Sequence, residues 1–135
     1  MRLKILTPER VTLDADMIDS VFARSTRGEF GVLKGHIPLV AALDVGLLAY
    51  TQGGRRHTAA VMGGVLETDG NTVIVLTSAA ELSSEVDTLR ARHARERAEA
   101  RLREKSDNVD LKRAELALSR AIARIKASSS ADDLG

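Results

Sequence analysis

The sequence has no cysteine and no tryptophan, and its 135 residues include only two phenylalanines and one tyrosine. Without cysteine the chain has no disulfide, no thiol nucleophile and no thiolate metal ligand. With so few aromatic rings we expect no platform for stacking nucleic-acid bases, and a core built from Leu, Val, Ile and Ala. No stretch approaches about 18 uncharged apolar residues, so we expect no segment inserted in a membrane.

An excess of one charge is also missing, since 20 Lys and Arg stand against 19 Asp and Glu. The whole-chain charge therefore favours neither nucleic acid nor an acidic membrane surface as a partner. The distribution is less even: residues 1–85 carry eight basic and ten acidic side chains, and residues 86–135 carry twelve basic and nine acidic ones. With 44% hydrophobic residues the chain falls in the globular range, with room for one domain and an appendage.

Helix breakers are confined to the first half of the chain. Both prolines and nine of the ten glycines lie at or before Gly70. This half contains short β-rich runs at residues 3–6, 17–23, 47–51, 58–62 and 72–76, and Gly53-Gly54 and Asp69-Gly70 are two-residue hairpin signals. Because no helical segments separate these runs, the pattern predicts an antiparallel sandwich or barrel of about 80 residues and excludes a parallel α/β sheet.

The second half has the period of helices. Ser84 to Asp87 resembles a capping box, which predicts a first helix running to about residue 105. Its expected apolar face is Ala91, Ala94, Ala98 and Leu102, flanked by Leu89, and its expected ion pairs are Arg92 with Glu96 and Arg95 with Glu99.

A polar turn over residues 106–108 separates this helix from a second one, predicted over about residues 110–127. The second helix has a heptad-like seam of Leu111, Ala114, Leu118, Ala121 and Ile125. The short connection predicts an antiparallel hairpin, and residues 128–135 are expected to form a frayed, disordered tail. Because alanine buries little surface, we expect the hairpin to be weakly held and able to move.

Local signals for catalysis are missing. The three histidines, at positions 36, 57 and 93, do not have metal-ligand spacing. There is no nucleophile elbow, and the glycines of residues 28–35 are not followed by the Lys-Ser/Thr ending of a phosphate-binding loop. We therefore predict no catalytic residue, no metal and no cofactor.

The segment Gly-Glu-Phe-Gly-Val-Leu-Lys-Gly-His-Ile-Pro-Leu-Val, residues 28–40, is the most informative. Its glycines and proline alone indicate a tightly bent structural loop between strands. The segment also resembles the signature loop of the epsilon subunit of F-type ATP synthases, Gly-Glu-x-Gly-x-x-x-Gly-His-x-Pro-x-(Val/Ile). Further similar motifs extend the resemblance over about residues 2–127: Leu-Thr-Pro at 6–8, Gly-Gly-Val-Leu-Glu at 63–67, Arg-Glu-Arg-Ala-Glu at 95–99 and Lys-Arg-Ala-Glu-Leu at 112–116. Lys34 and Val65 depart from the usual Pro and Phe.

This resemblance implies a β-sandwich of about ten strands over residues 1–84, which binds the gamma subunit and the c-subunit ring. It implies a regulatory two-helix hairpin over residues 85–127, which when extended reaches the alpha and beta subunits and inhibits ATP hydrolysis. Gly28, Glu29 and His36 would contact the c ring. The protein would be a noncatalytic rotor subunit, peripheral to the cytoplasmic face of a bacterial cell membrane or to a thylakoid membrane.

A second motif, Val-Asp-Thr-Leu-Arg-Ala at residues 86–91, begins the first expected helix. Helix capping by its aspartate, with a solvated basic face, is one sufficient reading. The motif also resembles the Ile/Leu-Asp-x-x-Arg-Ala sequence by which some bacterial epsilon subunits bind ATP, and closure of the hairpin would gather arginines of both helices around a polyphosphate. The resemblance implies a regulatory ATP site that includes Glu81, Val86, Asp87, Arg90 and Ala91. Helical spacing adds Arg97, on the same face as Arg90, and Arg120 and Arg124, one turn apart on the second helix.

Two other classes of function remain open at this point. One is a free-standing Arg-rich hairpin that binds an acidic protein or RNA, for which steep salt dependence would be diagnostic. The other is an ATP-hydrolysing enzyme, which activity of the isolated chain would reveal. Copurification with gamma would favour the rotor subunit over both.

Overall fold

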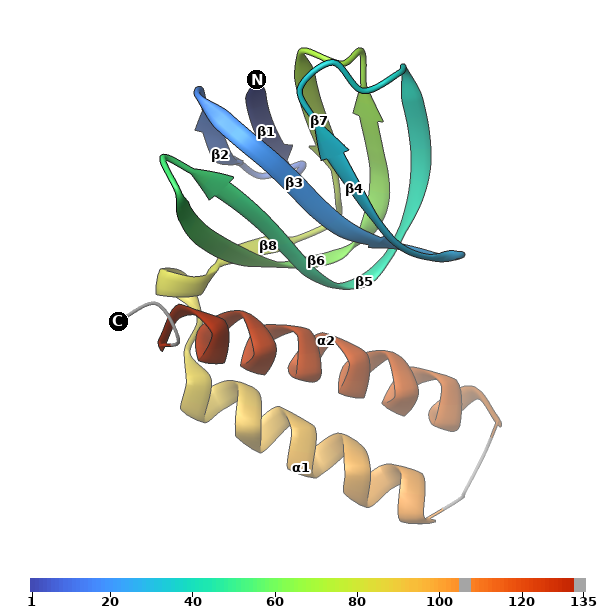
Figure 1. Cartoon of the computed structure of the whole chain (residues 1–135). Coiled ribbons are helices and arrows are strands. Elements are labelled where there is room, and N and C mark those ends of the chain that lie inside the picture. The colour runs from blue at the N-terminus through green and yellow to red at the C-terminus, as the bar shows by residue number, and fades with distance from the viewer. Residues whose placement is uncertain (105–107, 133–135) are drawn as a thin grey trace.

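A computed structural model describes residues 1–104 and 108–132, which form a β-sandwich stacked on two antiparallel helices (Figure 1). The strands are β1 (Arg2–Leu6), β2 (Val11–Ala15), β3 (Ile18–Ser25), β4 (Gly28–Leu33), β5 (Leu39–Gln52), β6 (Arg55–Thr68), β7 (Thr72–Leu76) and β8 (Ala80–Leu82). A short 3₁₀ helix, η1 (Ser83–Glu85), leads to α1 (Thr88–Glu104) and α2 (Asn108–Asp132). The expected fold class, a sandwich followed by a helical hairpin, is confirmed.

The sandwich is one continuous sheet folded into two layers. One layer contains β2, β1, β7, the second half of β6 and the first half of β5. The other contains β4, β3, the second half of β5, the first half of β6, and β8. The described residues form eight strands rather than ten because β5 and β6, with 14 residues each, pass through both layers. The pairing of β1 with β7 is parallel, and all the other described pairings are antiparallel.

The fold of β6 from one layer into the other depends on a glycine pair. Gly63 and Gly64 have φ values of 79° and 108°, which disfavour any residue with a side chain. A Cβ atom on Gly64 would also lie 1.9 Å from the carbonyl oxygen of Leu76 on the neighbouring strand. The predicted two-residue turn at Gly53-Gly54 is confirmed, and both glycines have positive φ. Asp69 and Gly70 also lie in a hairpin connection, but it has three residues, 69–71, rather than two.

The prediction of a bent loop from residue 28 onward is wrong for residues 28–33, which form β4. This strand pairs with β3 over its whole length, from Gly28 opposite Ser25 to Leu33 opposite Ser20. Gly31 allows the pairing because it has no side chain. A Cβ atom at this position would lie 2.5 Å from Cε1 of Phe22, whose ring fills that space. Only residues 34–38 connect strands.

The core between the layers is aliphatic, as the shortage of aromatics predicts. Its most deeply buried side chains are at most 2% exposed: Leu3, Ile5, Ile18, Val21, Val32, Leu48, Leu66, Val73 and Val75. Two aromatic residues join them among the described residues: Tyr50 is buried in the core and Phe30 packs against it partly exposed. Burial raises the pKa of Tyr50.

Helix α1 begins at Thr88, not at the predicted Ser84. The Oδ1 atom of Asp87 accepts a hydrogen bond from the backbone N–H of Arg90 at 3.1 Å, so Asp87 caps the helix by itself. Val86 is extended, with φ −73° and ψ 123°, which separates η1 from α1. The expected Arg95–Glu99 ion pair forms at 2.7 Å, whereas among the described residues no ion pair joins Arg92 to Glu96.

Helix α2 continues to Asp132, so residues 128–132 are helical where we expected a frayed tail. Residues 133–135 of that tail, and residues 106 and 107 of the expected turn, lie outside the described part. The last residue of the predicted range, Ala127, and the next residue, Ser128, both bond to other parts of the molecule. The buried hydroxyl of Thr58 donates to the carbonyl oxygen of Ala127 at 2.9 Å, and Thr88 donates to the hydroxyl of Ser128 at 2.9 Å.

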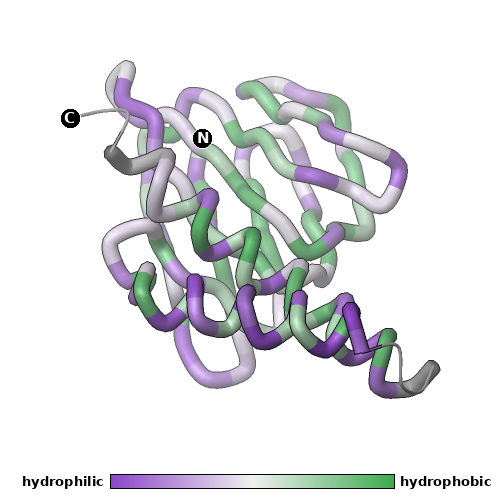
Figure 2. Tube along the Cα trace, turned by 90° about the horizontal axis from the view of Figure 1, so that it is seen from below, coloured by the Kyte–Doolittle hydropathy of each residue, from purple (hydrophilic) through white to green (hydrophobic). Residues whose placement is uncertain are grey.

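The hairpin is held by small side chains, as predicted. Between the helices Ala91, Ala98, Ala114 and Ala121 are at most 4% exposed. The predicted flanking residue, Leu89, is instead 65% exposed. Figure 2 shows hydrophilic and hydrophobic residues alternating along the helices, as befits helices with one buried side. None of the helices in the described ranges combines the length and apolar character needed to cross a bilayer.

Candidate functional site

A pocket of about 430 Å³ lies where the sandwich, the η1 segment and both helices meet. Strand β8 contributes one side chain, η1 and the residue that caps α1 contribute two, and the helices contribute the rest. The lining residues are Glu81, Glu85, Asp87, Arg90, Ala91, Ala94, Arg97 and Arg124.

Six of the eight residues of the predicted ATP set therefore line one pocket. Arg120 and Val86 do not. Arg120 is exposed one turn before Arg124, outside the lining. Val86 packs against the small apolar cluster between α2 and the sandwich, which includes Ala60, Met62 and Ala123.

An ion pair crosses the pocket from the sandwich to α2. Arg124 Nε lies 2.7 Å from Glu81 Oε1, and each side chain is 29% exposed. Arg90 and Arg97 lie two turns apart on the same side of α1, and in the part of the chain that the structure describes neither guanidinium has a carboxylate within the 4.0 Å of a salt bridge. The pocket thus presents three guanidinium groups from two helices, two of which have no acidic partner among the described residues.

Glu85 is a pocket residue that sequence reasoning missed, because its partner lies 75 positions away in the loop between β1 and β2. The Arg10 guanidinium donates to both carboxylate oxygens of Glu85, at 2.6 Å to Oε2 and 3.0 Å to Oε1. Glu85 Oε1 also accepts from the backbone N–H of Leu82 at 2.9 Å. The hydrogen bond from Arg10 is the largest cause holding the pKa of the Glu85 carboxyl below its usual range, and burial opposes it.

The three residues predicted to contact a c ring are spread along the sandwich. Gly28 begins β4 and His36 lies beyond its end, so the strand's rise of about 3.3 Å per residue separates them. All three nevertheless line one shallow pocket of about 670 Å³ on the sandwich, and Glu29 is exposed.

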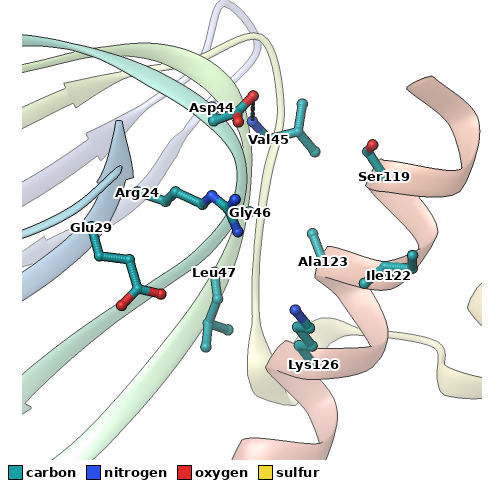
Figure 3. A pocket seen from close by; sticks show the side chains of 10 residues that line it. All are labelled: Arg24, Glu29, Asp44, Val45, Gly46, Leu47, Ser119, Ile122, Ala123 and Lys126. Atoms are coloured by element: carbon teal, nitrogen blue, oxygen red, sulfur yellow. Dashed lines mark hydrogen bonds between the residues drawn. The ribbon is translucent and has the colours of Figure 1, made fainter. Parts of the chain in front are cut away.

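A third pocket, of about 310 Å³, lies between the sandwich and α2 (Figure 3). Arg24, Glu29 and Asp44 reach it from the sandwich, while Ser119 and Lys126 line it from α2. Nothing in the sequence pointed to this pocket, whose charged side chains are exposed and of both signs. Among the described residues no group of three or more His, Asp or Glu is arranged to hold a metal ion.

The layer of the sandwich made with β1, β2 and β7 carries an apolar row on its outer side. The registers place the five residues side by side across five strands: Ala42, Val65, Leu76, Leu6 and Val11. Val11 is 62% exposed and Leu76 45% exposed, whereas the next residues along β1 and β7, Ile5 and Val75, are fully buried. A row of this kind is suited to docking against another protein.

Comparison with known proteins gives two family matches that follow each other along the chain. Residues 1–83 match the family described as ATP synthase, Delta/Epsilon chain, beta-sandwich domain, and residues 84–129 match the long alpha-helix domain of the same chain. The ATP synthase epsilon chain of Carboxydothermus hydrogenoformans is 45% identical over 102 residues, covering 76% of this chain and 75% of that one. That of Syntrophobacter fumaroxidans is 46% identical over 107 residues, 79% of each chain.

Solved structures give a consistent result. A chain in the OSCP/F1/c-ring structure of the Euglena gracilis mitochondrial ATP synthase superposes with a TM-score of 0.78 at 25% identity, covering 96% of this chain and 79% of that one. A chain of the central stalk and c ring of the Tetrahymena thermophila mitochondrial ATP synthase has a TM-score of 0.61 over 95% of this chain and 96% of that one. At 16% identity the second match speaks for the fold alone.

Proposed function

The chain belongs to the ATP synthase delta/epsilon chain family, and we propose that it is a noncatalytic rotor subunit in the central stalk of an F-type ATP synthase. The observation that carries this proposal is the pair of family matches, in order, over residues 1–129. In this role the chain couples ion-driven rotation to ATP synthesis, while other subunits catalyse the reaction. Its place is at the cytoplasmic face of a bacterial cell membrane, or at a thylakoid membrane, held there by its partners.

The sandwich offers two surfaces for two partners, and they adjoin at Ala42. The apolar row from Ala42 to Val11 is the surface we assign to the gamma subunit, since burying its exposed aliphatic side chains would favour a lasting contact. The pocket bordered by Gly28, Glu29 and His36 is the surface we assign to the c ring. Two surfaces on one rigid sandwich would let the chain connect a shaft to a ring.

The pocket of Arg90, Arg97 and Arg124 supports a regulatory ATP site. Guanidinium groups bind phosphate oxygens through paired, charge-assisted hydrogen bonds, and here they come from both helices. Because Arg124 lies on α2 and the other two on α1, they converge only when the hairpin is closed. ATP bound there stabilises the closed hairpin, by about 2.7 kcal/mol when its concentration is 100 times its dissociation constant.

The open hairpin is the form that we expect to inhibit ATP hydrolysis, by extending toward the alpha and beta subunits. The contacts of α2 with the sandwich that must break are Ala123 and Ala127 against Ala60 and Met62 of β6, the Thr58–Ala127 hydrogen bond and the Arg124–Glu81 ion pair. A buried methyl group contributes only about 0.8 kcal/mol and a hydrogen bond about 0.5–1.5 kcal/mol net, so these contacts are weak enough for a ligand to control.

The rotor assignment is tested by copurification of a tagged chain with gamma and the c ring. A cysteine introduced by Glu29→Cys should crosslink to the polar loop of subunit c, and crosslinks to alpha or beta alone would refute the c-ring surface. Lys34, the exposed residue that follows β4, offers a second cysteine position on the same segment, Lys34→Cys, for comparison with Glu29→Cys. A monomer that instead binds RNA with steep salt dependence would replace the proposal with the Arg-rich binding module.

A further inference from the structure

The proposed ATP pocket contains three carboxylates, although its ligand would be a polyanion. Glu81, Glu85 and Asp87 all line it. An uncompensated carboxylate beside a triphosphate repels it, so binding requires each negative charge to be offset. Glu81 is paired with Arg124, and Asp87 accepts the N–H of Arg90 at the positive end of the α1 dipole.

The negative charge of Glu85 is neutralised by Arg10, a residue that does not line the pocket. Arg10 belongs to the loop between β1 and β2, and its guanidinium grips both oxygens of the Glu85 carboxylate at 2.6 and 3.0 Å. A further bond of 3.1 Å joins Arg10 to the carbonyl oxygen of Ala80 at the start of β8. Arg10 therefore bonds both ends of the segment that leads from the sandwich into the hairpin.

The loop that carries Arg10 is itself ordered by local hydrogen bonds. The N–H of Thr7 donates to the carbonyl oxygen of Arg10 at 3.0 Å, and the hydroxyl of Thr7 accepts from the N–H of Arg10 at 3.1 Å. The guanidinium is thus presented from a short closed turn, which reduces the conformational entropy lost on pairing with Glu85.

We propose that Arg10 is a positioning residue for the nucleotide pocket: it neutralises Glu85 and holds its carboxylate against the sandwich, so that ATP affinity depends on a side chain of the β1–β2 loop. This inference rests on the proposed ATP site and extends it to the regulatory role of the sandwich. The pairing leaves the charges of Arg90 and Arg97 available to phosphate.

The test is titration of the full chain with ATP by calorimetry at low and high salt. Arg10→Gln leaves Glu85 charged and unpaired, and should weaken ATP binding about three- to tenfold at low ionic strength, the size expected for one extra unit charge near a protein surface. The loss of affinity should be smaller in about 0.5 M NaCl, because the Debye length is then only a few ångströms and the repulsion between Glu85 and ATP is screened. Arg10→Lys, which keeps the charge but not the paired geometry of the guanidinium, should recover part of the lost affinity.

Two further variants separate neutralisation from a merely structural latch. Glu85→Gln should bind ATP at least as tightly as the parent, and the double variant Arg10→Gln/Glu85→Gln should return to the parental affinity. The matched control is Arg2→Gln, which breaks the paired contact of Arg2 with Asp14, at 2.8 and 2.9 Å, at the other end of β1 and should leave ATP binding unchanged.

Weakening by Glu85→Gln, or no recovery in the double variant, would overturn the neutralising role, as would a loss in Arg10→Gln that is the same at both salt concentrations. Unchanged affinity in Arg10→Gln, with ATP binding to the parent, would refute the inference alone. No binding of ATP to the parent at millimolar concentration would overturn the nucleotide site itself, and the inference with it.

Discussion

Thr58 on β6 carries a hydrogen bond that only the closed hairpin can make. Thr58 is 2% exposed, and its hydroxyl donates to the carbonyl oxygen of Ala127 in α2 at 2.9 Å. Valine has nearly the same shape, so Thr58→Val removes the hydrogen bond without leaving a cavity. When the hairpin opens, water can bond the hydroxyl of Thr58, so the substitution acts almost entirely on the closed state.

The expected cost follows from the environment of the bond. A neutral intramolecular hydrogen bond contributes about 0.5–1.5 kcal/mol net, and the burial of Thr58 places it toward the upper end of that range. One kcal/mol changes an equilibrium constant about fivefold, since 1.4 kcal/mol corresponds to tenfold. We therefore expect Thr58→Val to shift the hairpin about fivefold toward the open form, and the global unfolding of the sandwich to change little.

The assay is the distance between a probe at exposed Leu89 on α1 and a second at exposed Val40 on β5, followed with the full chain. The matched control is Thr12→Val in β2, because the buried hydroxyl of Thr12 has no hydrogen-bond partner among the described residues. That variant should leave the hairpin equilibrium unchanged. An equal distance distribution in Thr58→Val and parent, or an equal shift in both variants, would refute the reasoning.

Three other predictions concern the pocket, the core and the hairpin. Arg124→Ala should raise the dissociation constant for ATP, measured by calorimetric titration, by about tenfold or more, because it removes a charge-assisted contact and leaves Glu81 unpaired. The control Lys126→Ala, an equal change of charge at an exposed position, should alter the titration little. Val75→Asp, at a fully buried position, should prevent folding of the sandwich, since an unpaired carboxylate there costs several kcal/mol of a stability of about 5–15 kcal/mol; a native circular dichroism spectrum would contradict this. Truncation after Glu85 should leave the sandwich folded, because its core cluster is separate from the α2 contact, and should raise ATP hydrolysis in the assembled enzyme; an unchanged rate with assembly intact would argue against inhibition by the hairpin.

The division of the chain into a β half and a helical half could be predicted from the sequence because both signals are local. Glycine and proline need particular φ values, and hydrophobic periods of two and 3.6 residues are read within short windows. The aliphatic core and the alanine interface followed in the same way, from which apolar residues were present to be buried. Six residues of the candidate pocket could also be predicted, three of them, Asp87, Arg90 and Ala91, from the contiguous motif of residues 86–91.

Tertiary contacts decided other features of the fold, which depend on more of the chain than a short sequence window contains. Residues 28–33 form a strand because β3 lies beside them and Phe22 fills the space over Gly31, an interaction that outweighs the turn preference of glycine. Helix α2 runs past Ala127 to Asp132, and Thr58 of the sandwich donates to the carbonyl oxygen of Ala127. Neither contact can be inferred from the propensity of the segment itself.

The same separation explains the pocket. Ser84 has the right spacing to cap a helix, yet Asp87 does so, because η1 and an extended Val86 intervene before α1. Arg120 has the right residue type, but its position on α2 turns it to solvent, and Glu85 joins the pocket through Arg10, 75 positions earlier. Residue type and spacing determine which side chains are able to bind phosphate; only the packing of the sandwich against the hairpin determines which charges meet, since Coulomb energy depends on distance in space and not along the chain.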